Sequence, residues 1–150
     1  MQKSNQQTRP KGFYGIVFLL LITSVLITVY WSDFFINGDL NVTKDRSYLD
    51  FEKSFPLADG WTALASLLSL VGLLRRKHWG VLFGIITGAG LLMTGMMDVL
   101  YNLNMGNYLL LPTNVPMIVE LILNLLCLSM GTLLIVYLWR NRMELYVSDS

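Results

Sequence analysis

The sequence predicts an all-α protein, a four-transmembrane-helix bundle that forms a single membrane domain over residues 1–150. The composition is 54% hydrophobic and only 14% charged, which is typical of an integral membrane protein and not of a soluble core. Apolar stretches long enough to cross a bilayer as helices lie at about 12–31, 56–74, 79–103 and 115–139, with a polar loop at 32–55. Short connections join the later stretches, so the helices are expected to run up-down-up-down.

The distribution of basic residues predicts the orientation of these helices. Lysines and arginines gather in the first tail, between the second and third stretches and after the fourth: Lys3, Arg9, Lys11, Arg75, Arg76, Lys77, Arg140 and Arg142. The loop 32–55 contains fewer of them, namely Lys44, Arg46 and Lys53. Because basic connections stay on the cytoplasmic side, both termini are expected in the cytoplasm and this loop outside.

Charge and residue counts exclude several classes of function. The net charge of +1 gives no basic surface for nucleic acid. The single cysteine, Cys127, excludes an intramolecular disulfide and a cysteine-based zinc cluster, and the single histidine, His78, excludes a histidine-rich metal or haem site. The sequence shows no flavin or nucleotide signature and no nucleophile–base pair, so it favours a role other than catalysis.

The first apolar stretch is expected to remain in the protein as a helix. It follows a basic tail as a signal peptide would, but the apolar run is too long and no small-residue cleavage site follows it. Tyr30 and Trp31 end it, and their amphipathic rings are expected at the level of the lipid headgroups. In the next loop Tyr48, Phe51 and Phe55 recur at helical spacing, which predicts a short helix on the membrane surface.

The second and third stretches are expected to form an antiparallel hairpin. Pro56 begins the second stretch, where its missing N–H costs nothing, and Asp59 follows near the first turn, where the helix dipole favours an anion. A tight basic turn at 75–78 joins the two stretches. The connection 104–116 is expected to dip into the membrane interface or to cover the mouth of the bundle.

Small and polar residues share the inner faces of the third and fourth stretches. At about 100° per residue, Asp98 and Asn102 lie on the face that carries a glycine stripe, and Glu120 and Asn124 lie on one face of the fourth stretch. Acids within a span turn toward the bundle interior, and small residues let helices approach closely. We therefore assign a helix-packing role to five glycines, which are Gly80, Gly84, Gly88, Gly95 and Gly131.

The predicted topology brings three acids into one leaflet and so predicts a ligand site there. Asp98 and Glu120 would be its main anionic ligands, Asn102 and Asn124 would orient them, and Asp59 would help at the rim. No lysine or arginine lies within a span, so a proton, a basic residue of the loop, a bound cation or an amine must balance the carboxylates. Oxygen ligands suit hard cations, and a metal ion would be held by Asp98 and Glu120.

Four motifs add a family resemblance to these patterns. They read FPLADGW at 55–61, GLLR at 72–75, WGVLFG at 79–84 and MDVLYN at 97–102. Together they resemble the motifs of small bacterial four-span integral membrane proteins to which no activity is assigned. The likeness covers the second to fourth stretches and is weaker over the first. It implies the architecture and a multi-pass location in the bacterial cytoplasmic membrane.

Three hypotheses about function follow. The first is a transport-associated or sensing protein whose outward-facing acidic pocket binds a cation or an amphiphilic amine. The second is a structural or accessory membrane protein whose acids only satisfy loop cations and helix ends, with the glycine stripe packing the bundle or a partner. The third is a lipid-modifying intramembrane enzyme with Asp98 and Glu120 as acid and base. The bilayer is the expected partner in each case, with a homo-oligomer or a second membrane protein as further partners.

Overall fold

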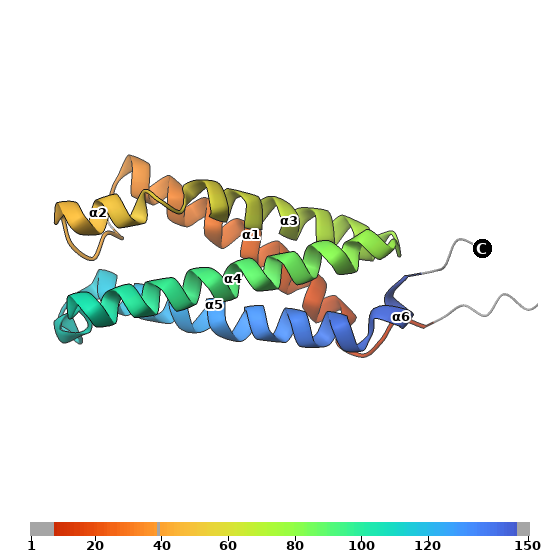
Figure 1. The fold of residues 1–150 in the computed structure, drawn as a ribbon. Helices are drawn as coiled ribbons and strands as arrows, with labels where there is room; N and C mark the ends of the chain where they lie inside the picture. Colours follow the sequence, from red (N-terminus) through yellow and green to blue (C-terminus); the bar gives the residue numbers. More distant parts are fainter. Residues whose placement is uncertain (1–7, 39, 147–150) are drawn as a thin grey trace, which may run out of the picture.

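The computed structural model describes residues 8–38 and 40–146, and every regular element in this part of the chain is helical. The elements in chain order are α1 (Phe13–Ile36), α2 (Arg46–Glu52), α3 (Pro56–Leu74), α4 (His78–Met105), the short 3₁₀ helix η1 (Asn107–Leu110), α5 (Val115–Arg140) and α6 (Arg142–Leu145) (Figure 1). The predicted all-helical class is therefore confirmed.

Four stretches of the described chain are long and apolar enough to cross a membrane. They are Phe13–Ile36, Arg46–Leu74, His78–Met105 and Val115–Arg140, of which the second joins α2 to α3. By length and composition the chain is a multi-pass membrane protein, as the apolar stretches predicted.

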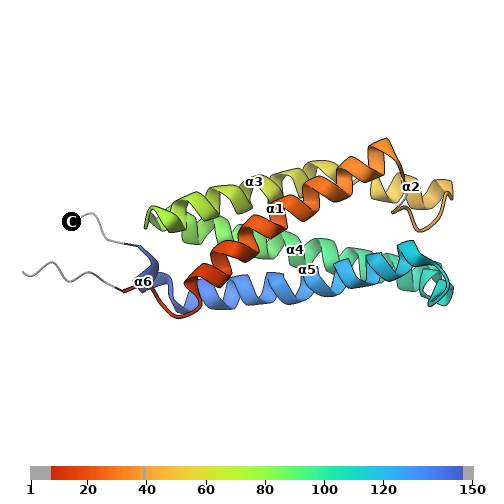
Figure 2. The same cartoon turned by 180° about the vertical axis from the view of Figure 1, so that it is seen from behind.

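The long helices pack in the order α1, α3, α4, α5. Two serine hydroxyls form hydrogen bonds between α1 and α3. Ser24 Oγ donates to the Ala63 carbonyl at 2.9 Å. Ser66 Oγ donates to the Leu20 carbonyl at 2.6 Å. In Figures 1 and 2, α1 begins beside α5 near α6 and then diverges from α5 toward α2. Its first half shares a buried apolar cluster with α5 through Ile16 and Leu138. The bundle is thus closed near α6, and α1 leaves α5 toward the opposite end.

Glycines lie where the helices approach most closely. A Cβ added to Gly80 would collide with the backbone of Gly72 on α3, 2.5 Å from its carbonyl carbon. A Cβ on Gly88 would lie 2.8 Å from the Gly131 carbonyl oxygen, and one on Gly131 would lie 2.7 Å from the Gly88 oxygen. These contacts are with backbone atoms that cannot rotate away, so the α3–α4 and α4–α5 crossings require residues without a side chain.

The remaining glycines of the stripe contact side chains of neighbouring helices. An added Cβ on Gly84 would collide with Leu138 Cδ1 and lie 2.7 Å from Ser69 Oγ. On Gly95 it would lie 3.1 Å from Cys127 Cβ. The stripe therefore faces α3 at its beginning and α5 over most of its length.

Helix α1 continues to Ile36, past the end expected at Trp31. The polar residues after Trp31 make local hydrogen bonds. Ser32 Oγ donates to the Thr28 carbonyl at 2.7 Å, and Asp33 Oδ2 accepts the N–H of Leu40, just beyond the helix, at 2.9 Å. Tyr30 and Trp31 consequently lie within the helix and face its neighbours, where the sequence had suggested a terminal ring at the headgroups.

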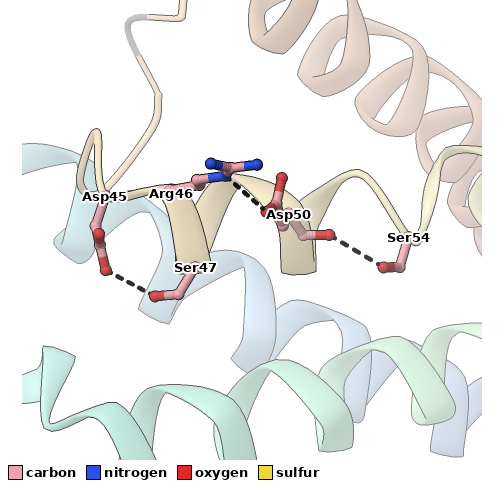
Figure 3. A network of polar contacts seen from close by, with 5 residues as sticks. All are labelled: Asp45, Arg46, Ser47, Asp50 and Ser54. Atoms are coloured by element: carbon pink, nitrogen blue, oxygen red, sulfur yellow. Dashed lines mark hydrogen bonds and ion pairs between the residues drawn. The ribbon is translucent and has the colours of Figure 1, made fainter.

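Helix α2 is the short helix predicted from the aromatic spacing, and it has two distinct faces. Its outer face carries the exposed ion pair between Arg46 and Asp50, 3.6 Å apart, and the Ser47–Asp45 hydrogen bond (Figure 3). On the other face Tyr48 is 1% exposed and Glu52 is buried. The exposed face suits solvent, and the inner face covers one end of the bundle.

The connection between α4 and α5 helps to close the same end. Gly106 begins it with a φ of +70°, a backbone conformation that favours glycine. Helix η1 then packs against α4 and α5. Asn114 accepts the Met117 N–H at the start of α5 and donates to the Val42 carbonyl at 3.1 Å, which ties this connection to the loop before α2. Of the two expected placements, the described part of the loop fits the one that covers the bundle mouth.

Candidate functional site

A cavity of about 90 Å³ lies within the bundle at the end that α2 covers. We call it the acidic cavity because four carboxylic acids line it, each from a different helix: Glu52 of α2, Asp59 of α3, Asp98 of α4 and Glu120 of α5. Asn124 also lines it. A single water needs roughly 10–15 Å³ of such space, so the volume admits several waters or a small polar head group.

Asp59 connects three helices. Its Oδ2 accepts the Trp31 indole N–H of α1 at 3.1 Å, and its Oδ1 accepts the Thr94 hydroxyl of α4 at 3.0 Å. The carboxylate is buried, so it acts in the interior and not as a solvent-exposed cap of α3. Both oxygens have a donor, and this leaves Asp59 well satisfied within the protein.

Glu120 is the centre of a second buried network. Its Oε2 accepts the Tyr48 hydroxyl of α2 at 2.9 Å, and its Oε1 accepts from the Asn102 side-chain amide. Asn102 also donates to the Asp98 carbonyl at 3.0 Å, and its Oδ1 accepts from Asn107 Nδ2 at 2.8 Å. Asn102 therefore orients Glu120 from behind the cavity without lining it.

Glu52 is an acid of the cavity that the sequence did not single out. Its Oε2 accepts the hydroxyl of Tyr30, on α1, at 2.8 Å. Glu52 follows Tyr48 by four residues and so shares its helical face. That spacing was the signal in the sequence that could have placed Glu52 on the inner face of α2. An acid among loop charges is normally solvated, however, and Glu52 points inward because this face of α2 packs on the bundle.

Asp98 differs from the other three acids. Within the described residues, no side chain or backbone N–H donates to its carboxylate, although Asp98 lines the cavity. Asn124, on the neighbouring helix α5, is 1% exposed, and its Nδ2 has no hydrogen-bond partner in the described part of the chain. Buried polar groups are ordinarily paired, so the Asn124 donor is unusual, whereas Asp98 is half-buried and its carboxylate lies at the cavity without a donor from the described residues.

No basic side chain balances these acids from the cavity wall. The lining contains no lysine, arginine or histidine. Of the loop cations, Arg46 pairs with Asp50 on the outer face of α2, and no ion pair joins Lys44 or Lys53 to an acid in the described part of the chain. Carboxylates in a medium of low dielectric constant need compensation, so protons or a cationic ligand must provide it.

The acids are not arranged as a metal centre. Among residues 8–38 and 40–146, no group of three or more histidine, cysteine, aspartate or glutamate side chains is placed to hold a metal ion. The pair considered for a metal, Asp98 and Glu120, therefore lacks a third ligand of these types. The site brings together Asp59, Asp98, Glu120 and Asn124 as lining residues and adds Glu52, Tyr30, Trp31 and Thr94.

Removing the Tyr48 hydroxyl is expected to destabilise the covered end of the bundle. In Tyr48→Phe the ring still packs, but Glu120 loses one of its two donors, which costs about 1–3 kcal/mol for a buried charged acceptor. Thermal unfolding of the purified protein measures the change. Tyr14→Phe is the matched control, because Tyr14 is exposed and its hydroxyl makes no hydrogen bond in the described chain. Equal melting temperatures for the two variants would contradict the role given to Tyr48.

Comparisons with models of protein families, with curated proteins and with solved structures gave no match.

Proposed function

We propose that this chain is a small membrane protein whose acidic cavity binds a cation or an amphiphilic amine, in a transport-associated or sensing role. The helices run up-down-up-down with both termini in the cytoplasm, so that the cavity opens in the outer leaflet. The basic residues near α6 support this orientation through the positive-inside rule. The resemblance of the sequence motifs supports the bacterial cytoplasmic membrane as the location.

The observation that carries the proposal is the carboxylate of Asp98, which has no donor among residues 8–38 and 40–146 and lines a cavity with three further acids. Acids that serve only the fold resemble Asp59, whose two oxygens both accept hydrogen bonds from neighbouring helices. An ammonium group offers positive charge and N–H donors, and it requires no fixed set of ligands. It therefore suits this cavity better than a metal ion does.

Thermal unfolding of the detergent-solubilised protein tests the proposal. Propylamine, dodecylamine and the chlorides of magnesium, calcium and manganese are the probes. A ligand present at 100 times its Kd stabilises the folded state by about 2.7 kcal/mol, which raises the Tm of a chain of this length by roughly 5–10 °C. We expect at least one amine to give this rise and Asp98→Asn to abolish it.

Asp50→Asn is the matched control, because Asp50 is an exposed acid on the outer face of α2. It is expected to keep the full response to amine. A rise in Tm that persists unchanged in Asp98→Asn, or the absence of any rise in the unmodified protein, would refute the binding function.

A structural role is the second candidate, and the cross-helix hydrogen bonds favour it. Glu52, Asp59 and Glu120 each accept from a side chain on another helix. The donors to these three acids are hydroxyl, indole and amide groups. The sequence-based form of this candidate used loop cations and helix ends instead. The same experiment separates the candidates, since a purely structural cavity changes stability on mutation but gives no response to amines.

A further inference from the structure

The lining of the acidic cavity is both acidic and apolar. The acids come from four helices, and they are Glu52 of α2, Asp59 of α3, Asp98 of α4 and Glu120 of α5. The apolar side chains that α1 and α5 contribute form what we call the apolar wall. Its residues are Leu26, Ile27, Leu123, Leu126, Cys127 and Met130. A ligand that fills the cavity therefore contacts both carboxylic acids and hydrocarbon.

The apolar wall is also the incomplete one. Helices α1 and α5 share buried contacts near α6 but diverge toward α2 (Figure 2). The interface between α1 and α5 is much smaller than the interface between α1 and α3 or between α4 and α5. Leu126 lines the cavity and is nevertheless 38% exposed. Both helices belong to candidate membrane spans, so the surface beside this wall faces lipid.

We propose that the ligand is a single-chain amphiphilic amine that enters from the bilayer between α1 and α5. This inference rests on the binding function proposed above. The ammonium group lies beside Asp98 and Glu120, and the alkyl chain extends past Leu126 into the space between the two helices. We call the gap bounded by Leu26 on α1 and Leu126 on α5 the lateral opening.

The chemistry of the cavity lining supports this class of ligand. No described side chain or backbone N–H donates to the carboxylate of Asp98, which can therefore accept from an ammonium group. The small volume admits an ammonium group and excludes a bulky head group. The chain remains in a hydrocarbon environment throughout, so no apolar surface has to enter water.

The test compares a long and a short amine in protein reconstituted into phosphatidylcholine nanodiscs. Dodecylamine and propylamine carry the same head group, and their apparent affinities are obtained from the dependence of the melting temperature on amine concentration. The double variant Leu26→Trp, Leu126→Trp narrows the lateral opening. We expect it to weaken dodecylamine binding at least 10-fold while changing propylamine binding by less than 2-fold.

The matched control is Val25→Trp, Leu125→Trp, which adds the same rings to adjacent exposed positions that do not line the cavity. It is expected to leave both affinities unchanged. If the first double variant does not fold, Met130→Phe repeats the test from another residue of the same wall.

Each outcome decides between the two proposals. Equal dodecylamine affinity in the opening variant and in its control overturns the lateral route and leaves the binding function intact. Stabilisation by propylamine without stabilisation by dodecylamine also overturns it, because the ligand is then a small cation. No response to either amine in the unmodified protein refutes the binding function itself.

Discussion

Replacing Gly131 with leucine is expected to destabilise the folded protein strongly. A Cβ at this position would lie 2.7 Å from the Gly88 carbonyl oxygen and 3.1 Å from the Leu92 backbone nitrogen. Backbone atoms on α4 cannot move without separating α4 from α5, so the cost should reach about 3 kcal/mol or more, which lowers the Tm by at least about 6 °C. Size-exclusion chromatography and thermal unfolding measure the loss.

The control for this substitution is Gly15→Leu on α1. A Cβ added to Gly15 meets nothing within 4 Å, and leucine favours a helix over glycine. Gly15→Leu should therefore behave like the unmodified protein or be slightly more stable. A Gly131→Leu protein that elutes and melts like the Gly15→Leu protein would show that the α4–α5 crossing tolerates side chains.

Replacing Asn102 with leucine is expected to be almost as damaging, through hydrogen bonding and not through size. The change leaves Glu120 Oε1 and Asn107 Nδ2 without the partners that Asn102 provides. A buried carboxylate that loses a donor and a half-buried amide that loses an acceptor together cost about 3–5 kcal/mol. Asn104→Leu makes the same change at an exposed position on α4 and should alter stability by no more than about 0.5 kcal/mol.

A double-mutant cycle identifies the cause of the Asn102 effect. If the cost comes from the stranded carboxylate, adding Glu120→Leu to Asn102→Leu should restore at least about 1 kcal/mol, because removing both partners avoids an unsatisfied buried group. Additive losses in the double variant would assign the effect to packing instead.

Periodicity and hydropathy were sufficient for the long helices and for the acids on their inner faces. Asp98 and Glu120 could be placed because glycines and amides share their faces, and helices in lipid turn such residues inward. The same reasoning extended from Asp98 to Asn102, one turn away, and the structure gives Asn102 a direct bond to Glu120.

Glu52, Tyr30 and Trp31 could not be placed in the same way. Helix α2 stands outside the apolar stretches, so nothing in its local composition indicates that one face is buried. Trp31 stands at the last residue of the apolar run, and aromatic residues at such ends commonly meet the headgroups. Their true positions depend on how far α1 extends and on which helix it crosses, and these are properties of the assembled bundle.

The hydrogen bond from Trp31 to Asp59 has a consequence for observing this protein. The chain contains four tryptophans, and among the described residues that line the acidic cavity Trp31 is the one indole. Indole emission depends on the charge and hydration around the ring. The fluorescence spectrum therefore contains a component from Trp31 that responds to what occupies the cavity, and the protein carries its own optical probe of occupancy.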